Sequence, residues 1–494
     1  MILTTSDASD ASDASHASPR SSQNANTEPE PSVRWVLASL SLSMLLSSLG
    51  TSIANVGLPT LAQAFNASFQ EVQWIVLAYL LSITALIVSA GRLGDLMGRK
   101  RVLLAGIFLF SAASILCAVA PTLWLLVAAR AAQGLGAAVM MALTMALVGE
   151  AVPKARTGSA MGLLGTMSAA GTALGPSLGG VLIAISGWQA IFWVNVPLGI
   201  LTFFLARRYL PAGPNGPTAA SPRFDHGGTL LLALTLAAYG LAMTTGHGNS
   251  GLPNMALLPA VVLGAGLFVF VESKAKFPLV RLAMFRAPGF SASLAANMLV
   301  ATVMMATLVV GPFYLSRALG LNAALVGAVM SMGPIISALS GVPAGRMVDR
   351  LGAPSMAIAG LIAVAAGAAA LAALPALVGI AGYVAAMFIL TPGYQLFQAA
   401  NNTAIMANVA SDQRGVVSGM LSLSRNLGLM TGASAMGSLF AFASAATDIT
   451  AASPGAVATG MQVTFAVAAV LVVIAITITI AFGGRVRAKP RLSQ

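Results

Sequence analysis

The feature that most limits how this chain can fold is a succession of apolar, almost uncharged runs. Each run is close to the roughly 20 residues that a helix needs to cross a bilayer. The sequence therefore predicts an all-α polytopic membrane protein with fourteen membrane helices. The runs lie at about 33–57, 71–90, 102–120, 122–149, 158–185, 190–206, 228–246, 255–271, 290–315, 323–344, 355–373, 377–407, 415–441 and 461–482.

Charge is scarce, and its placement argues against a soluble protein. Only 8% of the residues are charged, where a soluble domain carries roughly 25%. A net charge of +12 can indicate a nucleic-acid partner, but here the cations follow the loops and form no basic face, so we expect no nucleic acid. The single cysteine excludes a disulfide within the chain. We expect neither a metal nor a cofactor.

The positions of Lys and Arg predict the orientation in the membrane. If the N-terminus is cytoplasmic, 22 of the 25 cations fall in cytoplasmic loops or tails, as the positive-inside rule requires. Arg317 then lies outside, and Arg130 and Arg425 lie within predicted helices. We therefore expect both termini in the cytoplasm.

Two motifs recur in the two halves of the chain. The charged turn Gly91-Arg-Leu-Gly-Asp-Leu-Met-Gly-Arg-Lys-Arg101 returns 254 residues later as Gly345-Arg-Met-Val-Asp-Arg-Leu-Gly352. Five glycines of the run at 158–185 return in the run at 415–441 with an offset of 257. Two parallel six-helix units would place a substrate path at their interface.

The repeats and the composition predict five segments. Residues 1–32 are rich in Ser, Asp, Ala, Asn and Pro and too poor in apolar groups to form a core, which predicts a disordered cytoplasmic tail. The other four are an N-terminal six-helix bundle at 33–209, cytoplasmic linkers with two additional membrane helices at 210–289, a C-terminal six-helix bundle at 290–482 and a basic cytoplasmic tail at 483–494.

The first charged turn resembles the loop signature of the major facilitator superfamily. Arg130-Ala-Ala-Gln133-Gly134 resembles that family's Arg-x-x-Gln-Gly motif, and Gly171-Thr-Ala-Leu-Gly-Pro-Ser-Leu-Gly-Gly180 resembles the motif of its exporters. With the segment from Gly187 to Gly199, the chain resembles the fourteen-helix drug:proton antiporter subfamily over about residues 33–482. The resemblance implies the major facilitator fold.

The resemblance also implies a function. The protein would be a secondary transporter rather than an enzyme, exporting small amphiphilic compounds, drugs included, by alternating access driven by the proton gradient. Its partners would be a small-molecule substrate and the lipid bilayer of a bacterial plasma (inner) membrane. Whether a periplasmic adaptor and an outer-membrane channel take part stays open. The gating loop would comprise Gly91, Asp95, Gly98, Arg99, Arg101, Asp349 and Gly352.

The exporter motif predicts close helix packing. Glycines four apart form a flat stripe on which another helix can lie, and a proline bends the helix. We expect this helix to bend against the other half of the protein, although an ordinary packing face would explain the glycines alone. The motif residues are Gly171, Gly175, Pro176, Gly179 and Gly180.

Proton coupling needs a group that gains and loses a proton, usually a carboxylate. The subfamily usually has an aspartate where this chain has Gly50, and no carboxylate falls deep within a predicted helix. The remaining coupling candidates are Arg130, Gln133, Glu150 and Glu71. The alternatives are that Glu71 and Glu150 are solvated interfacial charges, and that Arg130 reaches the cytoplasmic interface and braces a loop.

Uncharged polar residues at helical spacing predict a substrate cavity. The candidates are Ser52, Asn55, Thr391, Tyr394, Gln395, Gln398, Asn402 and Arg425. Such stripes can also serve only to join helices. Because Arg130 and Arg425 are the only charges predicted inside, we expect neutral or anionic amphiphiles rather than lipophilic cations.

Two other functions remain open at this point. The substrate could be an endogenous metabolite such as an amino acid, a sugar or a natural product. A non-transporting receptor or scaffold is also compatible with the missing acid. A primary pump is disfavoured because the chain has no Gly-x-x-x-x-Gly-Lys-Ser/Thr phosphate loop.

Overall fold

The structure is a computed structural model. It describes residues 33–67, 69–211, 225–244, 251–275, 278–407, 409–410, 413–445 and 453–483. The predicted tail at 1–32 lies outside these ranges, as does all but Gly483 of the predicted tail at 483–494.

All regular elements in these ranges are helices, so the predicted all-α class is confirmed. They are α1 (Val33–Ala64), α2 (Phe69–Met97), α3 (Arg99–Ala118), α4 (Leu123–Ala151), η1 (Lys154–Arg156), α5 (Thr157–Ser186), α6 (Ala190–Trp193), α7 (Asn195–Tyr209), α8 (His226–Thr244), α9 (Gly251–Lys274), η2 (Leu282–Arg286), α10 (Pro288–Phe313), η3 (Tyr314–Ala318), α11 (Ala323–Leu351), α12 (Ala353–Ala407), α13 (Arg414–Ala443) and α14 (Pro454–Gly483).

Eleven of the described helical segments are long and apolar enough to cross a membrane. Among them α12 counts once, although its 55 residues change direction at Val378 and Gly379, where φ is −131° and 60°. Beyond that point the chain runs back along itself. The evidence is the close contact between Gly367 and Leu390, where a Cβ on Gly367 would lie 2.6 Å from the Cα of Leu390. Neither α8 nor α13 is among the eleven, so the predicted number of fourteen spans stays a prediction.

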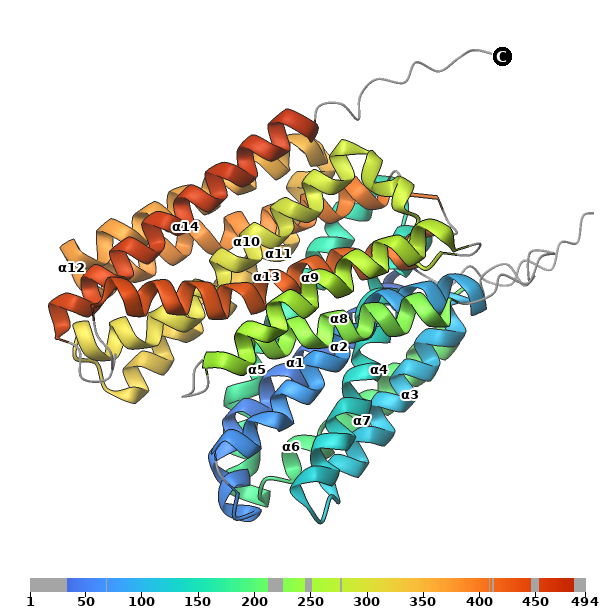
Figure 1. The fold of residues 1–494 in the computed structure, drawn as a ribbon, viewed down its shortest axis with the longest axis horizontal. Helices are drawn as coiled ribbons and strands as arrows, with labels where there is room; N and C mark the ends of the chain where they lie inside the picture. The colour runs from blue at the N-terminus through green and yellow to red at the C-terminus, as the bar shows by residue number, and fades with distance from the viewer. Residues whose placement is uncertain are drawn as a thin grey trace, which may run out of the picture.

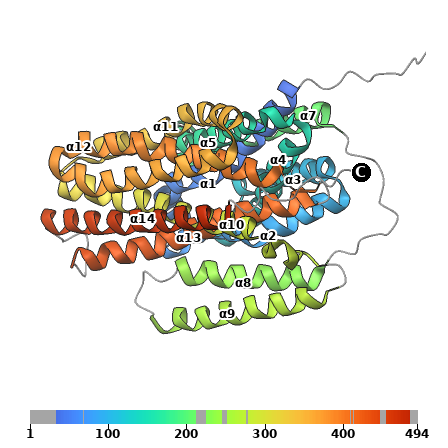
Figure 2. The same cartoon turned by 90° about the horizontal axis from the view of Figure 1, so that it is seen from above.

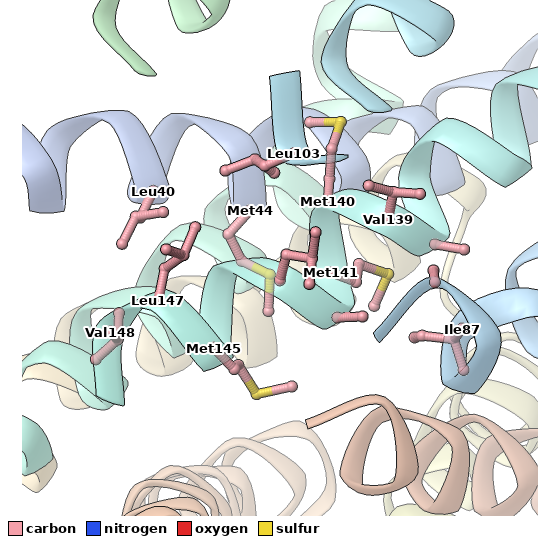
Figure 3. Packing of buried hydrophobic residues seen from close by; sticks show 14 of the residues in the cluster. Leu40, Met44, Ile87, Leu103, Val139, Met140, Met141, Met145, Leu147 and Val148 are labelled. Atoms are coloured by element: carbon pink, nitrogen blue, oxygen red, sulfur yellow. The ribbon is translucent and has the colours of Figure 1, made fainter. Parts of the chain in front are cut away.

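The long helices form two groups, α1 to α7 and α10 to α14, which lie side by side in Figure 1. Buried residues of the first half include Leu40 of α1, Ile87 of α2 and Leu103 of α3, which Figure 3 shows in one packed cluster. The second half has its own cluster, with Phe397 of α12 and Phe440 of α13. The first cluster also contains Val417 and Leu421 of α13, so the core of the first half continues into the second half where α13 packs against α2 and α4.

The helices α8 and α9 lie outside both groups, along one side of the molecule (Figure 2). α8 contacts α2 of the first half and α13 of the second. The Tyr239 hydroxyl hydrogen-bonds the Thr431 hydroxyl, and Gly240 leaves room for Leu81 and Met430 to approach. The additional pair of helices thus covers the seam between α2 and α13.

Two carboxylates lie close together where α8 begins and α9 ends. Asp225 precedes α8 and accepts a hydrogen bond from the Gly228 amide at 2.8 Å, and Glu272 of α9, 3% exposed, accepts one from the Leu279 amide at 3.2 Å. The other oxygen of each, Asp225 Oδ2 and Glu272 Oε2, is buried without a hydrogen-bond partner among the described residues. Both side chains approach Gly228, so two acidic groups lie next to each other, with Glu272 buried and Asp225 half-buried.

Candidate transport site

The two charged turns have the same backbone conformation in the two halves. Gly98 separates α2 from α3 with a φ of 95°, and Gly352 separates α11 from α12 with a φ of 89°. Residues with a side chain rarely adopt such positive values, which explains glycine at both positions. The sequence repeat is therefore a structural repeat.

Asp95 links the first half to the second. Its carboxylate accepts hydrogen bonds from the backbone amides of Gly415 at 2.9 Å and Val416 at 3.0 Å, in the first turn of α13. The amides of a first helical turn have no partner within the helix and carry positive partial charge. Arg99 lies 2.8 Å from Asp95 and 2.7 Å from Glu150, so the cation joins two carboxylates. Glu150, near the end of α4, is therefore paired with the first charged turn and does not face the centre of the protein.

Asp349 makes the corresponding link from the second half to the first. It accepts hydrogen bonds from the amides of Gly158 at 2.7 Å and Ser159 at 2.8 Å, at the start of α5. The position that corresponds to Arg99 is Ala353 in the second copy. The second link consequently lacks the ion pairs of the first.

Glycines bring the halves together beside these links. Gly91 of α2 lies so close to the Gly415 carbonyl that a Cβ would overlap it, and a Cβ on Gly158 would lie 2.7 Å from the Gly345 carbonyl. Two other predicted residues lie apart from the contact, since Arg101 is exposed and Glu71 is exposed in the first turn of α2. The halves therefore meet at the end that carries both charged turns.

Two motif glycines of α5 pack against α1, whereas the start of α5 packs against α11 of the other half, where a Cβ on Gly162 would overlap the Gly341 carbonyl. The predicted bending of this helix against the other half stays a prediction. A Cβ on Gly171 would lie 2.6 Å from the Leu45 carbonyl, and one on Gly175 would lie 2.9 Å from the Ile53 nitrogen. Both neighbours belong to α1 of the same half. A Cβ on Gly180 would meet nothing within 4 Å, while Gly179 is buried and Pro176 lies within α5.

The second half repeats this packing. A Cβ on Gly432 of α13 would lie 2.5 Å from the Thr302 carbonyl of α10. The Thr302 hydroxyl donates to the Gly428 carbonyl at 3.0 Å, just as Ser52 of α1 donates to the Gly171 carbonyl at 3.1 Å. The motif residues therefore hold each half together, and they do so with repeated hydrogen bonds.

Arg130 lies in the core of the first half. It is 0% exposed, and its guanidinium donates to the carbonyls of Gly50 at 3.1 Å and Ile75 at 3.0 Å and to Gln133 Oε1 at 2.5 Å. The guanidinium carbon is 4.1 Å from the centre of the Tyr79 ring, a cation–π distance. Burial among these acceptors excludes the alternative that Arg130 reaches the cytoplasmic interface. Gly50, the position of the family's aspartate, supplies a carbonyl to Arg130.

A cavity of about 310 Å³ lies between the two halves. Its lining comes from α1, α2, α4 and α5 on one side and from α10 to α13 on the other. Six of the predicted cavity residues line it: Thr391, Tyr394, Gln395, Gln398, Asn402 and Arg425. Ser52 and Asn55 do not, because Ser52 is used in the contact with α5 and Asn55 is exposed elsewhere. Arg130 and Gln133 also lie outside the lining.

The sequence did not indicate the methionines of the cavity. Seven line it, and Figure 3 shows three of them, Met44 of α1 with Met141 and Met145 of α4, in the packed cluster. A methionine in an apolar helix gives no periodic signal that separates a cavity wall from a core. The many methionines in the composition, 24 in all, were the only available sign.

The two walls of the cavity differ in polarity. All five amide side chains of the lining belong to the second half, and so does Arg425, the only charged residue in the described lining. Several of these groups have a buried polar atom without a partner among the described residues, including Arg425 Nε, Gln398 Oε1 and Asn297 Oδ1. On the first half, the hydroxyls of Ser48 and Ser168 hydrogen-bond each other at 2.8 Å. The polar capacity still free to bind a ligand is thus on the second half.

Two helical halves around a central cavity define a multi-pass membrane transporter rather than an enzyme. The family model described as Major Facilitator Superfamily matches residues 40–433, and the chain belongs to that family.

Known proteins agree with this assignment. The multidrug resistance protein Stp of Mycobacterium tuberculosis is 30% identical over 82% of this chain and 75% of its own. The riboflavin transporter RibZ of Clostridioides difficile is 30% identical over 83% of this chain and 88% of its own. The crystal structure of the human organic anion transporter MFSD10 superposes with a TM-score of 0.63 at 14% identity, covering 91% of this chain and all of that one. At that identity the likeness shows the fold.

Proposed function

We propose that this transporter exports small amphiphilic compounds, drugs included, from the bacterial cytoplasm by alternating access. The observation that carries the proposal is the central cavity, which combines methionines with amide groups and Arg425. Flexible, polarisable methionines adapt to ligands of different shape. The name of Stp as a multidrug resistance protein, at 30% identity, supports the same function.

The two charged turns supply the gate in this proposal. Asp95 and Asp349 hold the cytoplasmic ends of the halves together in the described state, which would leave the cavity to open outward. Breaking both links would let the halves rock apart at that end and admit substrate. The position of the protein in the plasma (inner) membrane, with both termini in the cytoplasm, is part of this proposal.

Proton antiport is the proposed energy source. Each proton that crosses a potential of 100 mV releases roughly 2.3 kcal/mol. The described lining of the cavity holds no carboxylate, so we place the coupling step at the Asp95–Arg99–Glu150 cluster, where a proton on either acid would weaken the gate.

A metabolite exporter is the second candidate function. The name of RibZ, a riboflavin transporter at 30% identity, favours it, because a bulky metabolite with an aromatic ring suits the same cavity. A substrate screen in a host that lacks its own efflux pumps separates a narrow metabolite exporter from a drug exporter.

The test of the proposed function is transport into proteoliposomes under an imposed pH gradient. We expect uptake of dyes into vesicles that are acidic inside, and loss of that uptake when the gradient is dissipated. Dye flux of equal rate with and without the pH gradient would contradict proton coupling but not transport. An absence of flux for every substrate would point to the receptor or scaffold instead.

A further inference from the structure

The inference concerns the chemical class of the substrate, and it rests on the proposed function. The starting point is the unequal polarity of the two cavity walls. Arg425 projects from α13 into a cavity whose described lining contains no acidic side chain. Its Nε is buried and has no hydrogen-bond partner in the described part of the chain.

A guanidinium in such a place lacks the anion that it would normally bind. Arginine is rarely left without acceptors, because its five N–H groups and its charge are costly to keep from water or an anion. Arg130 shows how the fold satisfies a buried arginine, since backbone carbonyls and Gln133 surround it. Arg425 is only partly buried, and no described residue accepts a hydrogen bond from its Nε, so its acceptors have to come from the cavity, which leaves the guanidinium available to an anionic ligand.

Neighbouring groups on the same wall fit the remaining needs of such a ligand. Gln398 donates to the Tyr394 hydroxyl at 3.0 Å, and its Oε1 has no partner in the described chain. Thr391 and Ser422 each have a buried hydroxyl oxygen without a partner there. These uncharged groups can bind polar atoms beside the anionic group without cancelling the charge of Arg425.

The opposite wall suits a flat apolar body. Met44, Met141, Met145 and Met161 line it. Thioether sulfur makes favourable contacts with aromatic rings, worth about 0.3–1.5 kcal/mol each. The hydroxyls on this wall already form hydrogen bonds, as in Ser48 with Ser168, so they are less available to a polar group of the ligand.

We propose that the cavity binds aromatic organic anions, with a carboxylate or sulfonate against Arg425 on the second half and the ring system against the methionines of the first half. A lipophilic cation would meet the guanidinium charge at the same depth with no acid to offset it. The preference follows from the whole lining and does not depend on the identity of the coupling group.

A matched pair of dyes tests the proposal. Fluorescein and rhodamine methyl ester share a xanthene ring system, but the first is anionic and the second cationic at neutral pH. Binding is measured by fluorescence anisotropy with the full chain in lipid nanodiscs, and Nile red serves as the neutral probe. We expect the wild-type protein to bind fluorescein at least ~10-fold more tightly than the rhodamine ester, because charge-assisted hydrogen bonds are the strong ones.

Variants locate the effect. Arg425→Gln should weaken fluorescein binding by ~10-fold or more and leave Nile red unchanged, whereas Arg425→Lys keeps the charge and should retain most of the affinity. Arg317→Gln is the matched control, since Arg317 is exposed and outside the cavity lining. An unchanged Tm in detergent shows that a variant is folded, and nanodiscs without protein give the signal of dye dissolved in the lipid.

Three results overturn the proposal. They are tighter binding of the rhodamine ester by the wild-type protein, fluorescein binding that Arg425→Gln leaves unchanged, and binding of Nile red without any binding of fluorescein. In each case transport of Nile red in the pH-gradient assay would keep the proposed export function. Absence of transport for all three dyes would remove the export function as well.

Discussion

The carboxylate of Asp95 lies 2.9 Å from the backbone nitrogen of Gly415, although 320 residues separate them in the sequence. The bond crosses from one half of the protein to the other, and Asp349 makes its counterpart to Gly158 in the opposite direction at 2.7 Å. Two aspartates, one from each half, thus each bind the first turn of a helix from the other half, and the proposed gate predicts that closure depends on them.

Asp95→Asn should favour the state that is open at this end. The substitution removes the ion pair with Arg99 and the charge that strengthens two amide hydrogen bonds. Hydrogen bonds to charged groups contribute roughly 1.5–3 kcal/mol, which corresponds to a roughly ten- to hundredfold shift in the equilibrium. We expect slower efflux with substrate binding retained.

Cysteine labelling measures that shift. Cys117 is the only cysteine, so Cys117→Ser gives a background in which Val417→Cys, at a position 0% exposed, reports separation of the halves. Labelling should rise strongly with Asp95→Asn and less with Asp349→Asn, which has no ion pair to lose. Equal labelling of the Val417→Cys background, its Asp95→Asn variant and its Asp349→Asn variant would contradict the gating role of Asp95.

Arg130→Ala should destabilise the first half rather than alter substrate affinity. The change leaves Gln133 Oε1, on a side chain that is 0% exposed, without its donor, and it removes the guanidinium that fills the space between α1, α2 and α4. Unsatisfied buried groups cost about 1–3 kcal/mol each, so we expect a loss of at least about 2 kcal/mol, seen as a lower Tm in detergent. Arg317→Ala, at an exposed position, should change nothing. A stable Arg130→Ala protein with altered dye affinity would contradict the structural role.

Gly175→Ala should weaken the contact between α5 and α1. The added Cβ would overlap Ser52 and approach the Ile53 nitrogen to 2.9 Å, and overpacking of this kind costs about 1–3 kcal/mol. Gly180→Ala lies in the same motif but meets nothing within 4 Å. A lower Tm for the first variant only, partly restored by Ser52→Gly, is the expected result. Equal effects of the two alanines would show that the contact is not the reason for the glycine.

Glu272→Gln should keep or raise stability. Gln retains the acceptor for the Leu279 amide and removes one of two neighbouring negative charges. Glu272→Ala leaves that amide without its acceptor and should cost about 1–3 kcal/mol. Thermal unfolding of the two variants in one detergent compares them. If Glu272→Gln and Glu272→Ala lower the Tm equally, the ionised carboxylate itself is needed where α8 begins and α9 ends.

The fold could be predicted largely because a membrane and an internal repeat both limit the sequence. Apolar runs show where helices lie, and the shared offsets of Asp95 with Asp349 and of Gly158 with Gly415 show that the halves are copies. The break predicted at 374–376, between the apolar runs 355–373 and 377–407, lies a few residues before the observed change of direction at Gly379. The reason is that Pro375 interrupts the apolar pattern but does not determine where the chain turns.

The site could be predicted only in part, because spacing shows that residues share a helix face but not what that face meets. The stripe of Thr391, Gln395 and Gln398 does line the cavity. The similar stripe with Ser52 instead faces a neighbouring helix, and Arg130, a buried charge, finds its acceptors on the backbone of α1 and α2. Backbone acceptors leave no trace in a sequence.

The position of α8 has a mechanical consequence. It touches α2 and α13 together, whereas in the described chain neither α8 nor α9 reaches the opposite contact between α5 and α11 (Figure 2). In the proposed rocking motion, α2 or α13 would have to slide along α8, whereas α5 and α11 could separate without moving past either additional helix. We therefore expect opening to begin at the contact between α5 and α11 and the side covered by α8 to act as the hinge.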